Sequence, residues 1–223
     1  MINVFHANGS NGPGKVIKNL FLGFNKLGIQ YRSNPNNTNL GEKSIILQNH
    51  KILNSSIIHN AIIGPNICVI PPDNNIVMGQ QYKKMIVPSE WVKQKYMRWL
   101  SEDKLTVWPV GVDTDTFSDK SKQEKTNDCL IYFKRRSNQE IETIKNFLSS
   151  VGQTFEVIKY DPYKQTYTEE HFLNVISRSR YGIVIDNCES QGLAIEEMLS
   201  CNLPLLVWDI THWNDRGEDF KVS

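Results

Sequence analysis

Hydrophobic residues in the first half of the chain recur mostly with the spacing of strands. An apolar run at residues 2–5 precedes a glycine-rich loop, and apolar positions then recur at helical spacing until Gly28. A second helix is predicted after Ser89, which can cap it. Further apolar runs of strand length lie at 44–47, 61–63, 67–70, 84–87 and 105–109.

The second half of the chain alternates strands and helices regularly. Strands are predicted at 129–133, 155–160, 181–186 and 204–208, and helices at 168–177, at 192–201 and after a capping box formed by Ser137 and Glu140. Such alternation is typical of a parallel sheet covered by helices. Residues 119–128 contain no apolar side chain and are predicted to be a linker. The pattern therefore predicts two domains, 1–118 and 119–223.

The charge of the whole chain is nearly balanced, with 25 basic and 24 acidic residues, which disfavours a nucleic-acid partner. The halves differ, because residues 1–118 hold 12 basic and 7 acidic residues and residues 119–223 hold 13 and 17. A basic first domain favours an anionic acceptor or peripheral contact with a membrane surface, although a solvated helix face also explains its cations. No secretory signal or membrane-spanning run is visible, so we expect a cytoplasmic protein.

Candidate chemistry lies in the loops after strands, because open α/β sheets bind ligands beyond the carboxyl ends of their strands. The loop after the strand 181–186 contains Glu189 and leads into a predicted helix. Exposed N–H groups of Gly192 and Leu193 at that helix start would form an anion site suited to a phosphate.

Glu196 and Glu197 differ in their predicted surroundings, because residues four apart share a helix face. Glu197 lies on the row with Leu193 and Cys201. We therefore expect its carboxylate to lie among apolar neighbours and either to be paired or to contact a ligand hydroxyl. Two ordinary surface acids of a helix are the alternative interpretation.

The first glycine-rich loop satisfies most of a P-loop pattern, with Gly9, Gly14 and Lys15 at the required spacing. The next residue is Val16, which has no hydroxyl to hold Mg²⁺. A P-loop-like nucleotide hydrolase or kinase is therefore the weaker interpretation of this loop.

Four stretches resemble, in the same order, the retaining glycosyltransferases of the GT-B fold, family 4 (group 1). The segment ESQGLAIEEMLSCNLPLLVWD at 189–209 resembles the family's signature of two glutamates separated by seven residues. The stretches NGPGKVIKNLFLGFNKLG, VPSEWVKQKY and VWPVGVDTDTF are similar to earlier family segments. The resemblance implies an α/β protein with two Rossmann-like domains whose parallel sheets face each other across a cleft. The first domain would then be the acceptor side, and the second, shorter than is usual in the family, the nucleotide-sugar side.

The resemblance also implies roles for individual residues. Glu197 would hold the nucleotide ribose and Glu189 would contact the donor sugar. In this family an arginine and a lysine after the first strand of the second domain neutralise the departing diphosphate; here the candidates are Lys134, Arg135 and Arg136, with a solvated basic turn as the alternative. The other candidate donor contacts are Ser190, Gln191, Gly192, Leu193, Gly12 and Gly14, and His50 is the candidate for a family histidine near the transferred sugar.

The function implied by the resemblance is a metal-independent glycosyltransferase that retains the anomeric configuration. It would need no cofactor beyond its co-substrate, a nucleotide-diphospho-sugar donor, and would act on an unidentified glycan, lipid or small-molecule acceptor. A non-catalytic sugar-nucleotide-binding protein is the second alternative, because a shortened chain could keep the donor site without turnover.

Overall fold

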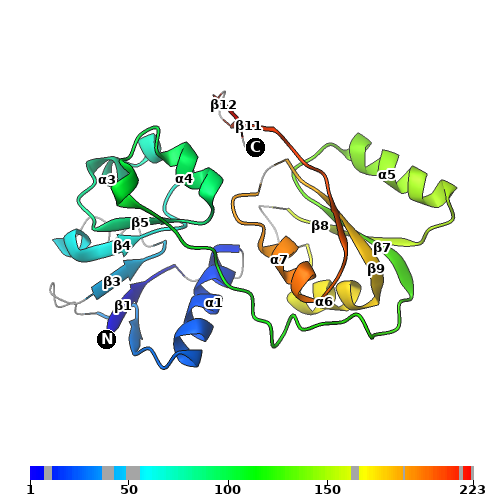
Figure 1. Cartoon of the computed structure of the whole chain (residues 1–223), viewed down its shortest axis with the longest axis horizontal. Coiled ribbons are helices and arrows are strands. Elements are labelled where there is room, and N and C mark those ends of the chain that lie inside the picture. Colours follow the sequence, from blue (N-terminus) through cyan, green and yellow to red (C-terminus); the bar gives the residue numbers. More distant parts are fainter. Residues whose placement is uncertain are drawn as a thin grey trace. The chain divides into compact units, whose positions relative to one another are not determined.

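The computed structural model describes residues 1–7, 12–36, 43–48, 56–161, 166–187, 189–215 and 218–221. The chain divides into two compact units, Met1–Gly111 and Val112–Ser223 (Figure 1). The division lies earlier than the predicted boundary after residue 118, because Val112 and Phe117 already pack into the core of unit 2. The predicted linker also belongs to unit 2, where the Lys125 ammonium donates to the carbonyl of Ser177 at 2.8 Å.

Within the described residues, unit 1 contains a six-stranded parallel sheet in the order β2-β1-β3-β4-β5-β6. Its strands are β1 (Ile2–Phe5), β2 (Tyr31–Ser33), β3 (Lys43–Ile46), β4 (Ala61–Ile63), β5 (Lys84–Val87) and β6 (Leu105–Val107). Its helices are α1 (Gly12–Lys26), α3 (Asn75–Gly79) and α4 (Glu90–Tyr96), with short 3-10 turns at Ser56–Asn60, Pro71–Asp73 and Glu102–Lys104.

Helices cover both faces of this sheet, because successive side chains of a strand point to opposite faces. In β1, Val4 packs with Phe24 of α1, whereas its neighbour Phe5 belongs to the cluster that includes Val92 and Tyr96 of α4. Unit 1 is therefore a layered α/β unit, compatible with a Rossmann-like fold.

The predicted strand at 67–70 is wrong. This segment lies between Pro65 and Pro71, which have no N–H groups to donate to a sheet. Two of its carbonyl oxygens accept hydrogen bonds from a side chain instead of a strand: the Tyr96 hydroxyl donates to the oxygen of Cys68 at 2.6 Å and to that of Val69 at 3.2 Å. The apolar run thus packs as an irregular segment onto α4.

Unit 2 contains, within the described residues, a four-stranded parallel sheet in the order β10-β9-β7-β8 and a separate antiparallel hairpin. The strands of the sheet are β7 (Asn127–Phe133), β8 (Phe155–Lys159), β9 (Ser179–Ile185) and β10 (Leu205–Val207), and the hairpin is β11 (His212–Asp215) with β12 (Glu218–Lys221). The helices are α5 (Asn138–Ser150), α6 (Glu169–Arg178) and α7 (Leu193–Ser200).

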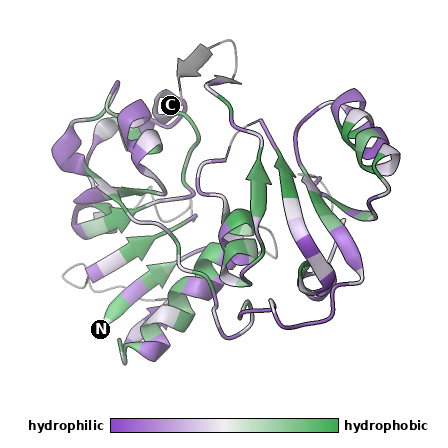
Figure 2. Cartoon of the chain, turned by 45° about the vertical axis from the view of Figure 1, so that its right-hand side comes forward, coloured by the Kyte–Doolittle hydropathy of each residue, from purple (hydrophilic) through white to green (hydrophobic). Residues whose placement is uncertain are grey.

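The sheet of unit 2 also has a core on each face. Ile131 packs with Ile141 of α5 on one face, and Leu130 belongs to the cluster of Phe172 and Met198, from α6 and α7, on the other. In Figure 2 the hydrophobic colour covers much of the strands, with polar stretches in several of them, and the helices carry both colours. The predicted α/β class with parallel sheets is confirmed. In the part of the chain that the structure describes, no helix has the length and apolar character needed to cross a membrane.

Candidate functional site

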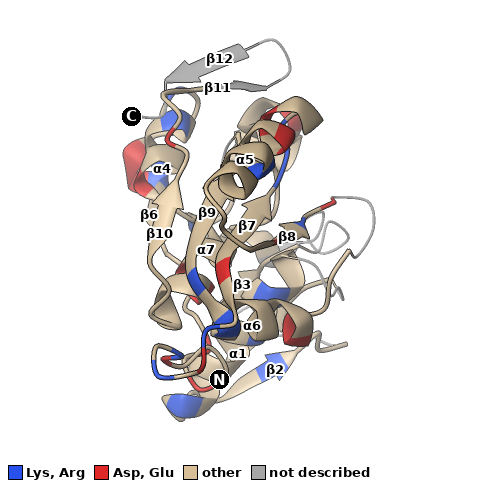
Figure 3. Ribbon diagram, turned by 90° about the vertical axis from the view of Figure 1, so that its right-hand side faces the viewer, with Lys and Arg blue, Asp and Glu red and all other residues tan. Residues whose placement is uncertain are grey.

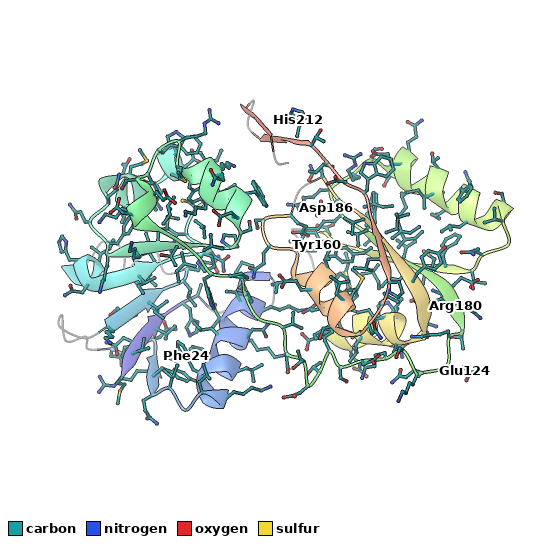
Figure 4. The ribbon with its side chains drawn as sticks, viewed as in Figure 1. Phe24, Glu124, Tyr160, Arg180, Asp186 and His212 are labelled. Atoms are coloured by element: carbon teal, nitrogen blue, oxygen red, sulfur yellow. The ribbon has the colours of Figure 1, made fainter. Side chains whose placement is uncertain are left out.

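The candidate site begins at the carboxyl edge of the four-stranded sheet of unit 2. Phe133, the last residue of β7, is in register with the last residues of β8 and β9. The residues that follow these three strands are Lys134, Tyr160 and Asp186, so they leave the sheet along one edge. Figure 4 shows Asp186 and Tyr160 at this end of the sheet and Arg180 at the other.

Four charged side chains, Lys134, Arg135, Asp186 and Glu189, form what we call the edge cluster. Lys134 Nζ donates to Glu189 Oε1 at 2.5 Å and lies 3.7 Å from Asp186 Oδ2. Arg135 donates twice to Asp186, from Nε to Oδ1 at 2.9 Å and from Nη2 to Oδ2 at 2.7 Å. Its Nη2 also lies 3.8 Å from Glu189 Oε2. Two cations face two carboxylates, so the formal charges of the cluster cancel.

Asp186 is the most deeply buried member of the edge cluster, with a side chain 6% exposed. Its Oδ1 also accepts the backbone N–H of Asn187 at 2.7 Å. Burial raises the pKa of Asp186 to about 6, against the opposing charges of Arg135 and Lys134. Sequence analysis did not include Asp186 among the site residues. An acid directly after an apolar strand, beside cations that follow another strand, is the signal that could have found it.

The backbone turn at Arg135 separates the three consecutive cations. Arg135 has a φ of 53°, in the left-handed region, which costs a residue other than glycine about 1–2 kcal/mol. Beyond this turn, Arg136 Nη2 donates to Glu140 Oε1 at 2.5 Å, and its guanidinium lies 5.5 Å from the ring centroid of Trp208. Lys134 and Arg135 therefore face the loop after β9, whereas Arg136 faces α5 and the end of β10.

Two aromatic rings flank the edge cluster. Tyr160, after β8, lies with its ring centroid 4.6 Å from Lys134 Nζ. Trp208, after β10, donates its backbone N–H to the carbonyl of Val184 and is 48% exposed. Each strand of the sheet thus contributes one residue to the row Trp208, Asp186, Lys134, Tyr160. Neither aromatic residue was predicted as part of the site, although each is the last residue of a predicted strand.

Helix α7 carries the other predicted donor contacts. The loop residues Ser190 and Gln191 lead to Gly192, which precedes the helix with a φ of 78°, and Leu193 is its first residue. On this helix Glu197 is 2% exposed, so it lies in the interior as its row of neighbours predicted. Burial, followed by the charge of Glu197, raises the pKa of Glu196.

A pair of tyrosines, one buried and one partly buried, lies in the interior of unit 2. The hydroxyls of Tyr132, on β7, and Tyr167, before α6, are 3.3 Å apart. Burial is the main cause that raises the pKa of each phenol, and the charges of nearby acids add to it: Glu189 acts on both tyrosines, and Glu197 acts on Tyr167. No pattern in the sequence pairs these tyrosines.

Three of the predicted site residues, Gly12, Gly14 and His50, do not belong to unit 2. Gly12 and Gly14 belong to unit 1, where they form the first turn of α1 together with Lys15. These residues are helical, whereas residues 8–11 of the P-loop-like pattern lie outside the described residues. His50 lies outside the described residues.

The geometry brings phosphate-binding and hydroxyl-binding groups together at one sheet edge. Lysine and arginine bind phosphate oxygens, and carboxylates accept hydrogen bonds from hydroxyls. Among the described residues, no group of three or more His, Cys, Asp or Glu side chains is placed to hold a metal ion.

A scan against protein-family models found no match to this chain, and a search of curated proteins found none either.

Proposed function

We propose that the edge cluster and helix α7 bind a nucleotide-diphospho-sugar, and that the chain is a metal-independent retaining glycosyltransferase of the GT-B type. The observation that carries this proposal is the edge cluster itself, in which Lys134 and Arg135 lie beside Glu189. The cluster combines cations for a diphosphate with an acid for sugar hydroxyls. It also lies at the carboxyl edge of a parallel sheet, where open α/β sheets bind ligands.

Lys134 and Arg135 are the groups that would bind the diphosphate. When the bond between the anomeric carbon and the diphosphate breaks, negative charge develops on the leaving oxygen. Cations fixed in advance near that oxygen stabilise the transition state more than the ground state. The two hydrogen bonds from Arg135 to Asp186 hold the guanidinium in place, so Asp186 acts as a positioning residue.

Glu197 and Glu189 are the groups that would bind the nucleotide ribose and the donor sugar, respectively. Glu197 is buried on α7, and a buried carboxylate is stabilised by hydroxyl donors. Glu189 lies on the loop after β9, beside both cations of the cluster. N–H groups at the start of α7 would add donors for a phosphate oxygen.

The proposed reaction moves the sugar to an acceptor hydroxyl on the same face that the diphosphate leaves. The acceptor oxygen forms the new bond to the anomeric carbon and passes its proton to the leaving phosphate oxygen. The contribution of the protein is then positioning and electrostatic stabilisation, with unit 1 as the acceptor side. The acceptor is a glycan, a lipid or a small molecule.

The first experiment measures thermal unfolding with UDP, GDP, ADP and dTDP sugars. A ligand that binds only the folded protein raises the free energy of unfolding by about 2.7 kcal/mol at a concentration one hundred times its Kd. We expect one nucleotide class to stabilise the wild type and Glu197→Gln to lose most of that shift. Glu196→Gln is the matched control, because it removes the neighbouring carboxylate of the same helix and should keep the shift.

A second measurement separates an enzyme from a binding protein. With the stabilising donor, a glycosyltransferase slowly releases free sugar and nucleoside diphosphate even without an acceptor, because water can replace the acceptor hydroxyl. Stabilisation without any release would indicate a non-catalytic sugar-nucleotide-binding protein. Stabilisation by Mg-ATP alone would contradict the proposal and favour a nucleotide hydrolase.

A further inference from the structure

We infer that Glu189 holds the position on Lys134 that a phosphate group of the ligand takes, so that a pyrophosphate-type ligand binds by exchange with the Glu189 carboxylate. The inference rests on the proposed function for the identity of that ligand, a nucleoside diphosphate. It adds the step by which the anion enters a cluster whose charges are already balanced.

The charge balance of the edge cluster makes this exchange necessary. Lys134 and Arg135 face Asp186 and Glu189, so the cluster has no formal excess of positive charge. A diphosphate brought beside both carboxylates would be repelled by them at short range. If the ligand takes the place of one carboxylate, the cations keep their charge-assisted hydrogen bonds and the repulsion from that carboxylate is reduced.

Glu189 is the carboxylate that can leave. Asp186 is 6% exposed and is held by both hydrogen bonds from Arg135 and by the N–H of Asn187. Glu189 is 22% exposed and lies on the loop between β9 and α7, where its carboxylate accepts a 2.5 Å hydrogen bond from Lys134. Withdrawal of the Glu189 side chain therefore leaves the Arg135–Asp186 pair intact.

The exchange also prepares the rest of the site. Lys134 is 13% exposed and lies against the ring of Tyr160, so its ammonium stays at the sheet edge when its anionic partner changes. The displaced Glu189 carboxylate then becomes an acceptor for sugar hydroxyls beside the diphosphate. Free nucleoside diphosphate lacks those hydroxyls, so for it the carboxylate is only a competitor.

The test measures binding of inorganic pyrophosphate by calorimetry at low salt, with the full chain. We expect Glu189→Gln to bind pyrophosphate about tenfold more tightly than the wild type, because apparent affinity rises when a competing state is removed. Glu142→Gln is the matched control. It removes the same charge from α5, where Glu142 pairs with Lys145 and where acidic and basic side chains lie together (Figure 3). This variant should leave the affinity for pyrophosphate within about twofold of the wild type.

A second variant separates exchange from simple repulsion. Glu189→Asp keeps the charge but shortens the side chain, so it weakens the contact with Lys134. We expect this variant also to bind pyrophosphate more tightly than the wild type. A gain in Glu189→Gln without a gain in Glu189→Asp would indicate simple repulsion and overturn the exchange. The exchange is also wrong if neither Glu189 variant binds pyrophosphate better than the wild type, or if no variant binds it.

The outcomes also separate this inference from the proposed function. Nucleoside diphosphate binding by the wild type without a gain in Glu189→Gln or Glu189→Asp would overturn the exchange alone. A gain for pyrophosphate, with no nucleoside diphosphate bound by any variant, would support the exchange and contradict the nucleotide-sugar function.

Discussion

Asp186 and Glu189 carry the same charge in one cluster, but only Asp186 is fully buried. Burial raises the pKa of Asp186 to about 6, whereas an unfolded aspartate titrates near 3.9. A carboxyl whose pKa rises on folding binds its proton more tightly in the folded state. The stability that it contributes is therefore complete below about pH 4 and is lost as the pH rises through about 6.

Asp186→Asn should remove this pH dependence. Relative to the wild type, we expect the variant to gain free energy of unfolding as the pH rises from about 4 to about 7, by at most about 3 kcal/mol. Urea denaturation of both proteins at the two pH values measures the difference.

Asp128→Asn is the control, because its effect on the free energy of unfolding should change with pH in the opposite direction. The backbone N–H of Thr154 is the main cause that lowers the pKa of Asp128, so its contribution is present at neutral pH and is lost on acidification. Asp128→Asn should therefore lose stability relative to the wild type as the pH rises. If Asp186→Asn behaved in the same way, Arg135 and Lys134 would outweigh burial at Asp186.

Single residues of the site were predictable to different degrees. The burial of Glu197 followed from its row on a helix, which is a local property of the sequence. The separation of Arg136 from Lys134 and Arg135 was not predictable. It depends on the left-handed backbone at Arg135 and on partners distant in sequence, such as Asp186.

At the scale of elements, the start of α5 connects helix stability to the site. The Ser137 hydroxyl accepts the N–H of Glu140 at 3.3 Å, and the Glu140 carboxylate accepts the N–H of Ser137 at 2.9 Å. The same carboxylate binds Arg136, which lies over Trp208. The helix cap therefore also holds the cation beside the exposed aromatic ring.

Ser137→Ala should lower the free energy of unfolding by about 1 kcal/mol, because it leaves an N–H of the first turn without its acceptor. Ser149→Ala, at the exposed far end of the same helix, should change it by less than about 0.5 kcal/mol. Chemical denaturation compares the two, and hydrogen exchange should locate the loss in the first turn of α5. Equal effects of both substitutions would mean that the cap does not stabilise the helix.

Elements with a clear apolar pattern were predictable, and those without one were not. The capping box of α5 and the alternation from β7 to β10 follow from local sequence, and the structure confirms them. Strand β2 was missed because its sequence, Tyr31-Arg32-Ser33, is mostly polar and exposed, and α3 was missed because five residues are too few for a helical period to emerge. The hairpin of β11 and β12 follows the last predicted strand, at 204–208, and was not predicted. At 67–70 an apolar run satisfied the strand pattern, but burial against α4 decided its structure.

At the scale of the whole molecule, the two units have separate hydrophobic cores. The clusters around Phe5 and Val4 consist of residues of unit 1, and those around Leu130 and Cys129 consist of residues of unit 2. Because no residue is shared between the two sets, a substitution in one core removes no core contact from the other.

Gly64 and Gly23 both belong to unit 1, and substitutions at them provide a matched test of whether the two cores are independent. Gly64 has a φ of 99°, and a Cβ there would lie 2.3 Å from the carbonyl oxygen of Ile86, whereas a Cβ at Gly23 in α1 meets nothing within 4 Å. Gly64→Ala should destabilise unit 1 by about 1–3 kcal/mol, and Gly23→Ala should stabilise it by about 0.5–1 kcal/mol.

Hydrogen exchange with mass spectrometry assigns each effect to a unit. In Gly64→Ala we expect faster exchange in β4 and β5 and wild-type exchange in β7 and β9, because the strained residue lies at the end of β4 and touches β5. Gly23→Ala should slow exchange in α1 and leave unit 2 unchanged. Equal loss of protection in both sheets of Gly64→Ala would mean that the chain unfolds as one cooperative body despite its separate cores, and ligand-induced shifts in thermal unfolding would then report on both units together.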